Sequence, residues 1–309
     1  MNKSKLKKLV LGASVLLISM NVFSFTPTAP NPEPDPDPDG CQIDCDFTRG
    51  PAPTSSYLEA YRGPYTVASQ GVPRSVSGFG GGTIYYPRST SGTMGAIAVI
   101  PGYLLQESAI DFWGPKLASH GFVVITISAN SGFDQPESRE TQLGRALDYV
   151  INQSRTSNSP ISGMVDSRRL GAVGWSMGGG GALRLASGER LSAVIPIAPW
   201  DQGGNSFGQI ETPTLIIACE NDSIASVGTH ASPFYNRIPS TTDKAFLEIN
   251  NGSHFCANDG GSNGGLLGKY GISWMKRFID NDTRYDQFLC GPDHEADNAI
   301  SEFRETCNF

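Results

Sequence analysis

Short apolar runs alternate with amphipathic segments along most of the chain. Six runs predict buried strands, at residues 95–100, 122–127, 168–173, 191–197, 214–218 and 245–249. Helical patterns lie between or after them, at residues 109–119, 141–152, 182–186, 233–238 and 266–280. Two further strands are expected at residues 72–79 and 83–86, joined by the three glycines 80–82. This alternation predicts an α/β fold with a central, mostly parallel, twisted sheet and helices on both faces.

The first 46 residues do not follow this pattern. Four lysines at positions 3, 5, 7 and 8 precede an apolar stretch at 9–20, and Val22-Phe23-Ser24 is an acceptable cleavage site. Residues 1–24 therefore indicate a secretory signal peptide; the alternative is a membrane anchor, for which the apolar stretch is short. Residues 25–46 are rich in proline and aspartate, which predicts an extended linker. We expect one folded domain over residues 47–309 and a secreted, extracellular protein.

The charge balance narrows the possible partners. The net charge is −7 and would become −11 once the four lysines of the signal peptide are removed. An acidic chain repels nucleic acid and anionic membranes, so we expect neither as a partner, and we expect a monomer. Six cysteines, an even number in an exported chain, favour disulfides over a metal site. We expect no metal and no cofactor.

One stretch indicates chemistry. The sequence Gly174-Trp175-Ser176-Met177-Gly178 joins the predicted strand at 168–173 to the predicted helix at 182–186. A strand that enters Gly-x-Ser-x-Gly and leaves as a helix is typical of the nucleophile elbow of α/β-hydrolases. The serine of such an elbow needs a base that takes its proton and a carboxylate that orients the base. In this fold both follow the serine in the chain, after later strands.

The base and the acid are found by elimination. His254 lies in the loop after the strand at 245–249, where the base is expected. The other three histidines fit less well. His120 precedes the serine, His230 follows the strand at 214–218 too closely, and His294 lies in a polar tail. Asp222, just after the strand at 214–218, is the expected acid. Glu220 lies one residue off the strand end, and Asp201, which follows an earlier strand, is the fallback.

Two backbone N–H groups are needed to stabilise the oxyanion that forms when a serine attacks a carbonyl. We expect one from Met177, the residue after the nucleophile, and one from Tyr103 in the loop after the strand at 95–100. Gly102 would let the backbone turn there. The ring of Tyr103 would lie along the cleft, although Tyr103 could also be an ordinary surface tyrosine.

Cysteines flank the candidate acid and base. Cys219 lies three residues before Asp222, and Cys256 lies two residues after His254. A bridge between these cysteines would tie the acid loop to the base loop, so we pair them. Cys290 and Cys307 lie in the C-terminal tail, and we pair them as well. Cys41 and Cys45 lie near the N-terminus and are either paired locally or partly free.

The connection between the strands at 191–197 and 214–218 affects access to the serine. Residues 198–213 leave no room for the cap domain that lipases and many esterases insert there, which predicts an open groove. Trp200 lies in this connection and Trp175 lies next to the serine. Tryptophans beside a groove suit aromatic or long apolar ligands, although a place in the buried core is about equally common.

Several ordered motifs resemble those of bacterial polyester hydrolases, the group of the cutinases and the poly(ethylene terephthalate) hydrolases. They cover roughly Arg62 to the C-terminus and are Pro101-Gly102-Tyr103, Gly174 to Gly181, Ala198-Pro199-Trp200, Cys219 to Ala225, Asn250 to Asn258, Trp274 to Phe278 and Asp282 to Tyr285. The resemblance implies a lidless α/β-hydrolase with esterase activity on polyesters. It also implies that Ser176, Asp222 and His254 form the triad and that Tyr103 and Met177 supply the oxyanion hole.

The resemblance further implies that a set of mostly aromatic side chains contacts the substrate: Tyr103, Trp175, Trp200, Ile224, Phe255 and Asn258. Trp175 and the cysteines beside the triad loops resemble the poly(ethylene terephthalate) hydrolase branch. Phe255, His230 and Phe234 instead resemble the thermophilic actinobacterial cutinases. From their size, we expect the side chains at 230 and 234 to pack behind Trp200 and to restrict its rotation.

Together these patterns predict a secreted serine ester hydrolase that cleaves polyesters and shorter acyl esters through an acyl-enzyme. Two other interpretations stay open: a triacylglycerol lipase or general carboxylesterase, and a non-catalytic surface protein with the hydrolase fold. We expect the activity to rise with pH as His254 loses its proton, because a protonated imidazole cannot accept the proton of a serine.

Overall fold

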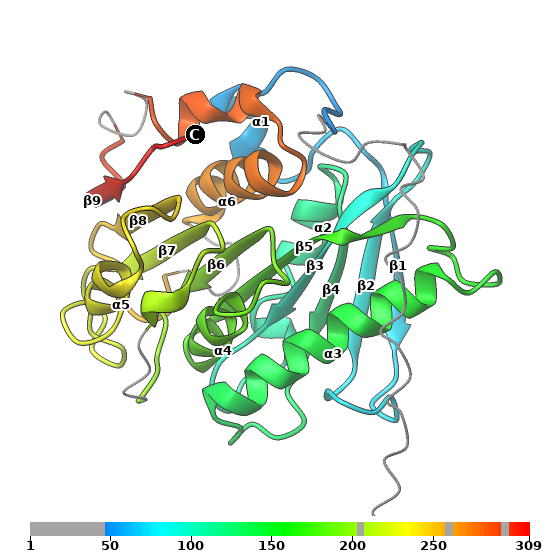
Figure 1. Cartoon of the computed structure of the whole chain (residues 1–309), viewed down its shortest axis with the longest axis horizontal. Helices are drawn as coiled ribbons and strands as arrows, with labels where there is room; N and C mark the ends of the chain where they lie inside the picture. The colour runs from blue at the N-terminus through cyan, green and yellow to red at the C-terminus, as the bar shows by residue number, and fades with distance from the viewer. Residues whose placement is uncertain (1–46, 203–206, 257–261, 292–296) are drawn as a thin grey trace, which may run out of the picture. The chain divides into compact units, whose positions relative to one another are not determined.

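Nine strands form a single sheet among the residues that the structure, a computed structural model, describes: 47–202, 207–256, 262–291 and 297–309. Their order across the sheet is β1-β2-β4-β3-β5-β6-β7-β8-β9 (Figure 1). The strands from β3 to β8 run parallel, and the strands at both edges are antiparallel to their neighbours. The strands are β1 (Val67–Val72), β2 (Gly82–Pro87), β3 (Met94–Ile100), β4 (Val123–Ile127), β5 (Val165–Trp175), β6 (Ala193–Ile197), β7 (Thr214–Cys219), β8 (Lys244–Ile249) and β9 (Ile300–Glu305). The predicted α/β fold is confirmed.

Helices cover both faces of this sheet. One core lies between the sheet and α3, α4 and α5, and a second lies between the sheet and α1, α2 and α6. Along β3, Ala98 and Ile100 face the first core, whereas Ile97 and Val99 face the second. Because successive side chains of a strand point to opposite faces, a strand covered on both sides must be apolar throughout. The helices are α1 (Ser55–Glu59), α2 (Trp113–Ala118), α3 (Pro136–Ser154), α4 (Met177–Ala186), α5 (Ala231–Arg237) and α6 (Gly264–Ile279).

The edges of the sheet differ from the prediction. The expected strand at 72–79 is wrong: β1 ends at Val72, and residues 73–79 form turns. Pro73 has no N–H for a ladder, and β1 buries only Ala68 and Val72, so its hydrophobic pattern is weak. At the other edge, β9 pairs with β8 although none of its residues is fully buried. This segment was not predicted as a strand.

The first predicted helix is shorter than expected. Residues 109–119 divide into the end of a 3₁₀ turn (Glu107–Ala109) and the helix α2. Within the described part of the chain, no helix combines the length and the apolar character needed to cross a bilayer. The predicted signal peptide (1–24) and linker (25–46) lie outside the described residues, and so do Cys41, Cys45, Asn258 and His294.

Candidate active site

Ser176 occupies the sharp turn between β5, which ends at Trp175, and α4, which begins at Met177. Its φ is 58°, in the left-handed region that residues other than glycine rarely adopt. Such a conformation costs about 1–3 kcal/mol and persists only where the surroundings impose it. Here the backbone N–H of Ser176 donates to the carbonyl of Ile197 at 2.9 Å, and its carbonyl accepts from the N–H of Trp200 at 2.9 Å. The turn is therefore held by the end of β6 and by the loop that follows it.

The structure brings Ser176, His254 and Asp222 together. The Oγ atom of Ser176 lies 2.9 Å from Nε2 of His254, and Nδ1 of His254 lies 2.7 Å from Oδ2 of Asp222. With its proton on Nδ1, the imidazole donates to the carboxylate, and its Nε2 is free to accept the proton of the serine. Asp222 follows β7 and His254 follows β8, so both loops lie at the carboxyl edge of the parallel sheet, where β5 delivers the serine.

The carboxylate of Asp222 is kept ionised by its surroundings. Burial alone would raise its pKa, but hydrogen bonds from His254 and from two backbone amides outweigh that effect and lower it. The amides belong to Ile224 and Ala225, and both donate to Oδ1 at 2.8 Å. A carboxylate held in this way stabilises a positive charge on the neighbouring imidazole.

The alternative acids and bases have other partners. The carboxylate of Asp201 accepts two hydrogen bonds from Arg184, at 2.6 and 3.0 Å, and that of Glu220 accepts the N–H of Asn251 at 2.7 Å. His230 stacks on Trp200 with ring centroids 6.0 Å apart, and His120 is buried against the ring of Tyr57. Among the histidines that the structure describes, only His254 contacts Ser176.

The two expected oxyanion donors border the serine. Met177 is the first residue of α4, and the amides in the first turn of a helix have no acceptor within the helix. Tyr103 follows Gly102, whose backbone packs directly on Ser176: a Cβ at this position would lie 2.7 Å from Cβ of Ser176. Only glycine permits this approach, and Tyr103 is the next residue of the same loop.

Both predicted disulfides of the described residues are present. Cys219, at the end of β7, is bonded to Cys256, two residues after His254. Cys290 is bonded to Cys307, which fixes the segment after β9. The first bridge joins the loop of the proposed acid to the loop of the proposed base.

Exposed apolar side chains surround the serine. They lie on the loops that follow β3, β4, β7 and β8 and are Tyr103, Leu104, Phe133, Ile224 and Phe255. The rings of Tyr103 and Phe133 are in edge contact, with centroids 5.7 Å apart. Leu104 and Phe133 were missed by the sequence analysis. Their position directly after two predicted parallel strands was the available signal, because binding sites of α/β sheets lie at the carboxyl ends of the strands.

Trp175 does not line the cleft, contrary to the expectation. Its side chain is 0% exposed and lies beneath the base loop, 5.8 Å from the ring of His254 and 5.5 Å from that of Phe255. The reason is the alternation along β5, which turns Trp175 to the same core as Val173. Trp200, in contrast, is partly exposed.

The site opens directly to the surface. Between β6 and β7, the described part of the connection holds only a 3₁₀ turn, Phe207–Gln209, and no cap domain.

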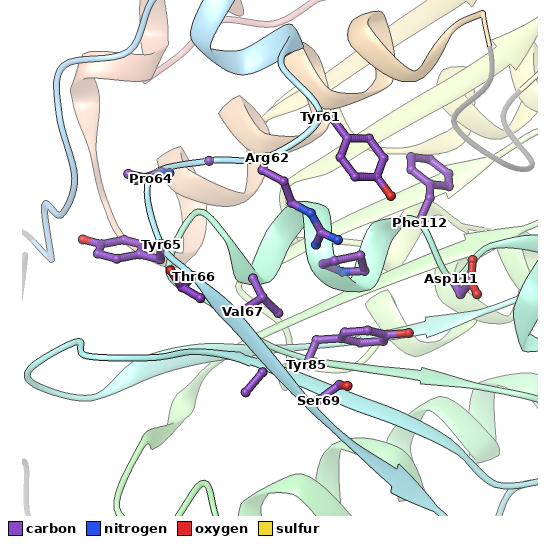
Figure 2. A pocket seen from close by; sticks show the side chains of 13 residues that line it. Tyr61, Arg62, Pro64, Tyr65, Thr66, Val67, Ser69, Tyr85, Asp111 and Phe112 are labelled. Atoms are coloured by element: carbon purple, nitrogen blue, oxygen red, sulfur yellow. The ribbon is translucent and has the colours of Figure 1, made fainter.

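A hollow of about 770 Å³ exists elsewhere, over β1, β2 and α2. Its lining residues include Tyr61, Arg62, Tyr85 and Phe112 (Figure 2). None of the three residues of the Ser-His-Asp cluster lines that hollow.

Comparison with known proteins identifies the family of this chain. Residues 42–308 match a family model described as PET hydrolase-like. The chain belongs to the PET hydrolase-like family.

Several characterised proteins are similar over most of the chain. A bis(hydroxyethyl) terephthalate hydrolase of Streptomyces coelicolor is 51% identical over 267 residues, which cover 85% of this chain and 83% of that protein. Cutinase 1 of Thermobifida cellulosilytica is 49% identical over 266 residues, covering 85% of this chain and 98% of that protein. A cutinase of Thermobifida fusca is 49% identical over 266 residues, which cover 85% of this chain and 86% of that protein. The predicted resemblance to the cutinase and PET hydrolase family is confirmed.

Proposed function

We propose that this chain is a secreted serine ester hydrolase that cleaves polyesters, aromatic ones included, and shorter acyl esters. The observation that carries the proposal is the position of His254, whose two ring nitrogens contact Ser176 and Asp222 at 2.9 and 2.7 Å. The names of the similar proteins, a bis(hydroxyethyl) terephthalate hydrolase and several cutinases, support an ester substrate. The exposed apolar side chains around the serine support a hydrophobic one.

The proposed reaction proceeds in two halves. His254 takes the proton of Ser176 while Oγ attacks the ester carbonyl, and the oxyanion accepts the N–H groups of Tyr103 and Met177. Asp222 stabilises the imidazolium, which then protonates the leaving alcohol. Water, deprotonated by His254, attacks the acyl-enzyme, and the acid product leaves with Ser176 restored.

Product release from polymer films tests the proposal. The measurement compares an aliphatic polyester film with amorphous poly(ethylene terephthalate), with Ser176→Ala as the control. We expect the wild type to release product from at least one film and the variant to release none. Cleavage of soluble short esters with no release from either film would move the function to a lipase or general carboxylesterase. No labelling of Ser176 by an organophosphate would exclude a serine hydrolase altogether.

The proposal includes export. Disulfides persist in oxidising compartments, and the two bridges among the described residues therefore support a secreted protein. We propose that residues 1–24 are a signal peptide, that 25–46 are a linker and that 47–309 are the catalytic domain. The family model begins at residue 42, close to the proposed start of that domain. Mass spectrometry of the mature N-terminus in a culture supernatant tests this assignment, and an uncleaved N-terminus would contradict it.

A further inference from the structure

Arg139 is a fully buried arginine whose partners are carbonyl oxygens. It lies in the first turn of α3 and is 0% exposed. Its Nη1 donates to the carbonyl of Pro101 at 2.9 Å, its Nε to that of Asp134 at 2.9 Å, and its Nη2 to that of Gly132 at 3.2 Å. Burial lowers its pKa to about 10, so it remains a cation at neutral pH. A buried cation is expensive unless it is well bonded, which suggests that these three bonds serve a purpose beyond filling the core.

The three carbonyls belong to two loops. Pro101 begins the loop after β3, which contains the proposed oxyanion donor, and Gly132 and Asp134 belong to the loop after β4. A second bond joins the same loops, because the N–H of Leu104 donates to the carbonyl of Gly132 at 2.8 Å. Tyr103 therefore lies between two attachment points, at Pro101 and at Leu104.

The loop after β4 is itself firmly held. The side chain of Asp134 accepts from the N–H of Ser131 and from Nε2 of Gln142, both at 2.9 Å. The N–H of Asn130 donates to Oε1 of Gln142 at 2.7 Å, and Gln142 is buried. This loop is thus a fixed platform, and Arg139 and the bond to Leu104 attach the oxyanion loop to it.

The backbone of the oxyanion loop is correspondingly constrained. Leu104 has a φ of 57°, which is unfavourable for a leucine and needs the surroundings to impose it. The ring of Tyr103 rests against that of Phe133 on the platform. The approach of Arg139 depends in turn on Gly181 of α4, because a Cβ there would lie 2.9 Å from Cβ of Arg139. Gly181 thereby lets α3 pack closely against α4 at the position of Arg139.

We propose that Arg139 is a positioning residue for the reaction. By fixing the carbonyl of Pro101 it sets the orientation of the following peptides, so that the N–H of Tyr103 points to the place where the oxyanion forms. This inference rests on the proposed function, in which Tyr103 supplies one of the two donors. Without the anchor, the loop would keep its fold but lose the alignment of that donor.

The test compares Arg139→Lys with the wild type on a matched pair of soluble substrates, an ester and the corresponding thionoester. A lysine keeps the charge but cannot reach three carbonyls at once. A misaligned donor lowers the rate by about 10- to 100-fold. We therefore expect kcat for the ester to fall by that factor while KM changes less than about twofold. The sulfur of a thionoester accepts hydrogen bonds weakly, so the ratio of ester to thionoester rates should fall as well.

Two further variants separate positioning from stability. Arg169 is also buried and donates to a backbone carbonyl, that of Thr93, but it lies in the N-terminal half of β5, whereas Ser176 follows the C-terminal end of that strand. Arg169→Lys should lower the melting temperature and leave kcat and the rate ratio unchanged. Gly181→Ala displaces Arg139 without deleting it and should lower the rate ratio in the same direction as Arg139→Lys.

The outcomes are distinct. A folded Arg139→Lys that keeps the wild-type ratio of ester to thionoester rates overturns the inference, even if its stability or kcat falls. If Arg139→Lys does not fold, the ratio measured for Gly181→Ala decides in the same way. A wild type that hydrolyses no ester contradicts the proposed function instead, and this result is visible before any variant is compared.

Discussion

The indole N–H of Trp175 donates to the backbone carbonyl of His254 at 3.0 Å, so the residue next to Ser176 supports the loop of His254 from beneath. The two residues are 79 positions apart in the chain. The ring of Trp175 also lies under that of His254, with centroids 5.8 Å apart. The orientation of the imidazole therefore depends on a buried side chain that does not reach the surface.

Trp175→Phe tests this support. Phenylalanine keeps an aromatic ring beneath the imidazole but leaves the carbonyl of His254 buried without its donor, which costs about 1–3 kcal/mol. We expect a lower melting temperature and a severalfold lower kcat. Trp113→Phe is the matched control, because Trp113 is equally buried and its N–H has no hydrogen-bond partner among the described residues. Equal loss of kcat in both variants would contradict a specific role for the bond.

Removal of the Cys219–Cys256 bridge should impair both stability and catalysis. The bridge closes a loop of 37 residues that contains Asp222 and His254. Replacing both cysteines with alanine should cost about 2–4 kcal/mol and, by loosening the loops of the acid and the base, should lower kcat. The double alanine variant of Cys290 and Cys307 is the control, since that bridge closes only the tail. It should lower the melting temperature alone. Unchanged kcat in both double variants would show that the first bridge does not position the triad.

His230→Ser should release Trp200. The two rings stack at 6.0 Å with an angle of 30°, and His230 in turn contacts Phe234 in edge geometry at 5.7 Å. An aromatic pair contributes about 0.5–1.5 kcal/mol, so its loss changes the ratio of the rotamer populations of Trp200 by roughly twofold to tenfold. We expect release from an aromatic polyester film to rise relative to an aliphatic one, with little change for a soluble short ester. Product yields from the two films measure the effect, and an unaltered ratio would exclude control through this stacking.

His120 should make the fold sensitive to acid. It is buried, both of its ring nitrogens lack hydrogen-bond partners among the described residues, and burial lowers its pKa to about 3. In the unfolded chain a histidine titrates near pH 6.5. Between these pH values the unfolded state binds a proton that the folded state does not. The free energy of unfolding therefore decreases as the pH is lowered, by at most about 1.4 kcal/mol per pH unit.

His120→Leu removes this titration. Denaturant unfolding at a series of pH values between 7 and 4 should therefore give a shallower decline for the variant than for the wild type. Parallel curves for the two proteins would mean that other groups cause the acid sensitivity.

The central strands and the nucleophile elbow could be read from the sequence because they depend on local pattern. The strands from β3 to β8 are covered on both faces, so their central stretches are mostly apolar, and the elbow requires glycines at fixed positions around Ser176. The edge strands β1 and β9 have no such requirement, since β1 buries only two residues and β9 buries none. Their pairing depends on their neighbours more than on their own composition.

The sequence by itself determined the α/β fold, the chain order of the proposed serine, acid and base, and the two disulfides of the described residues, because each leaves a mark in residue type and spacing. Only the tertiary structure decided which side chains meet at the site. It buried Trp175 beneath His254, exposed Phe133 beside Tyr103, and directed Arg139 to the carbonyl of Pro101. Whether a side chain contacts substrate, supports a loop or fills the core depends on the face of its strand and on what lies above it. Those relations join residues far apart in the chain, and no local pattern encodes them.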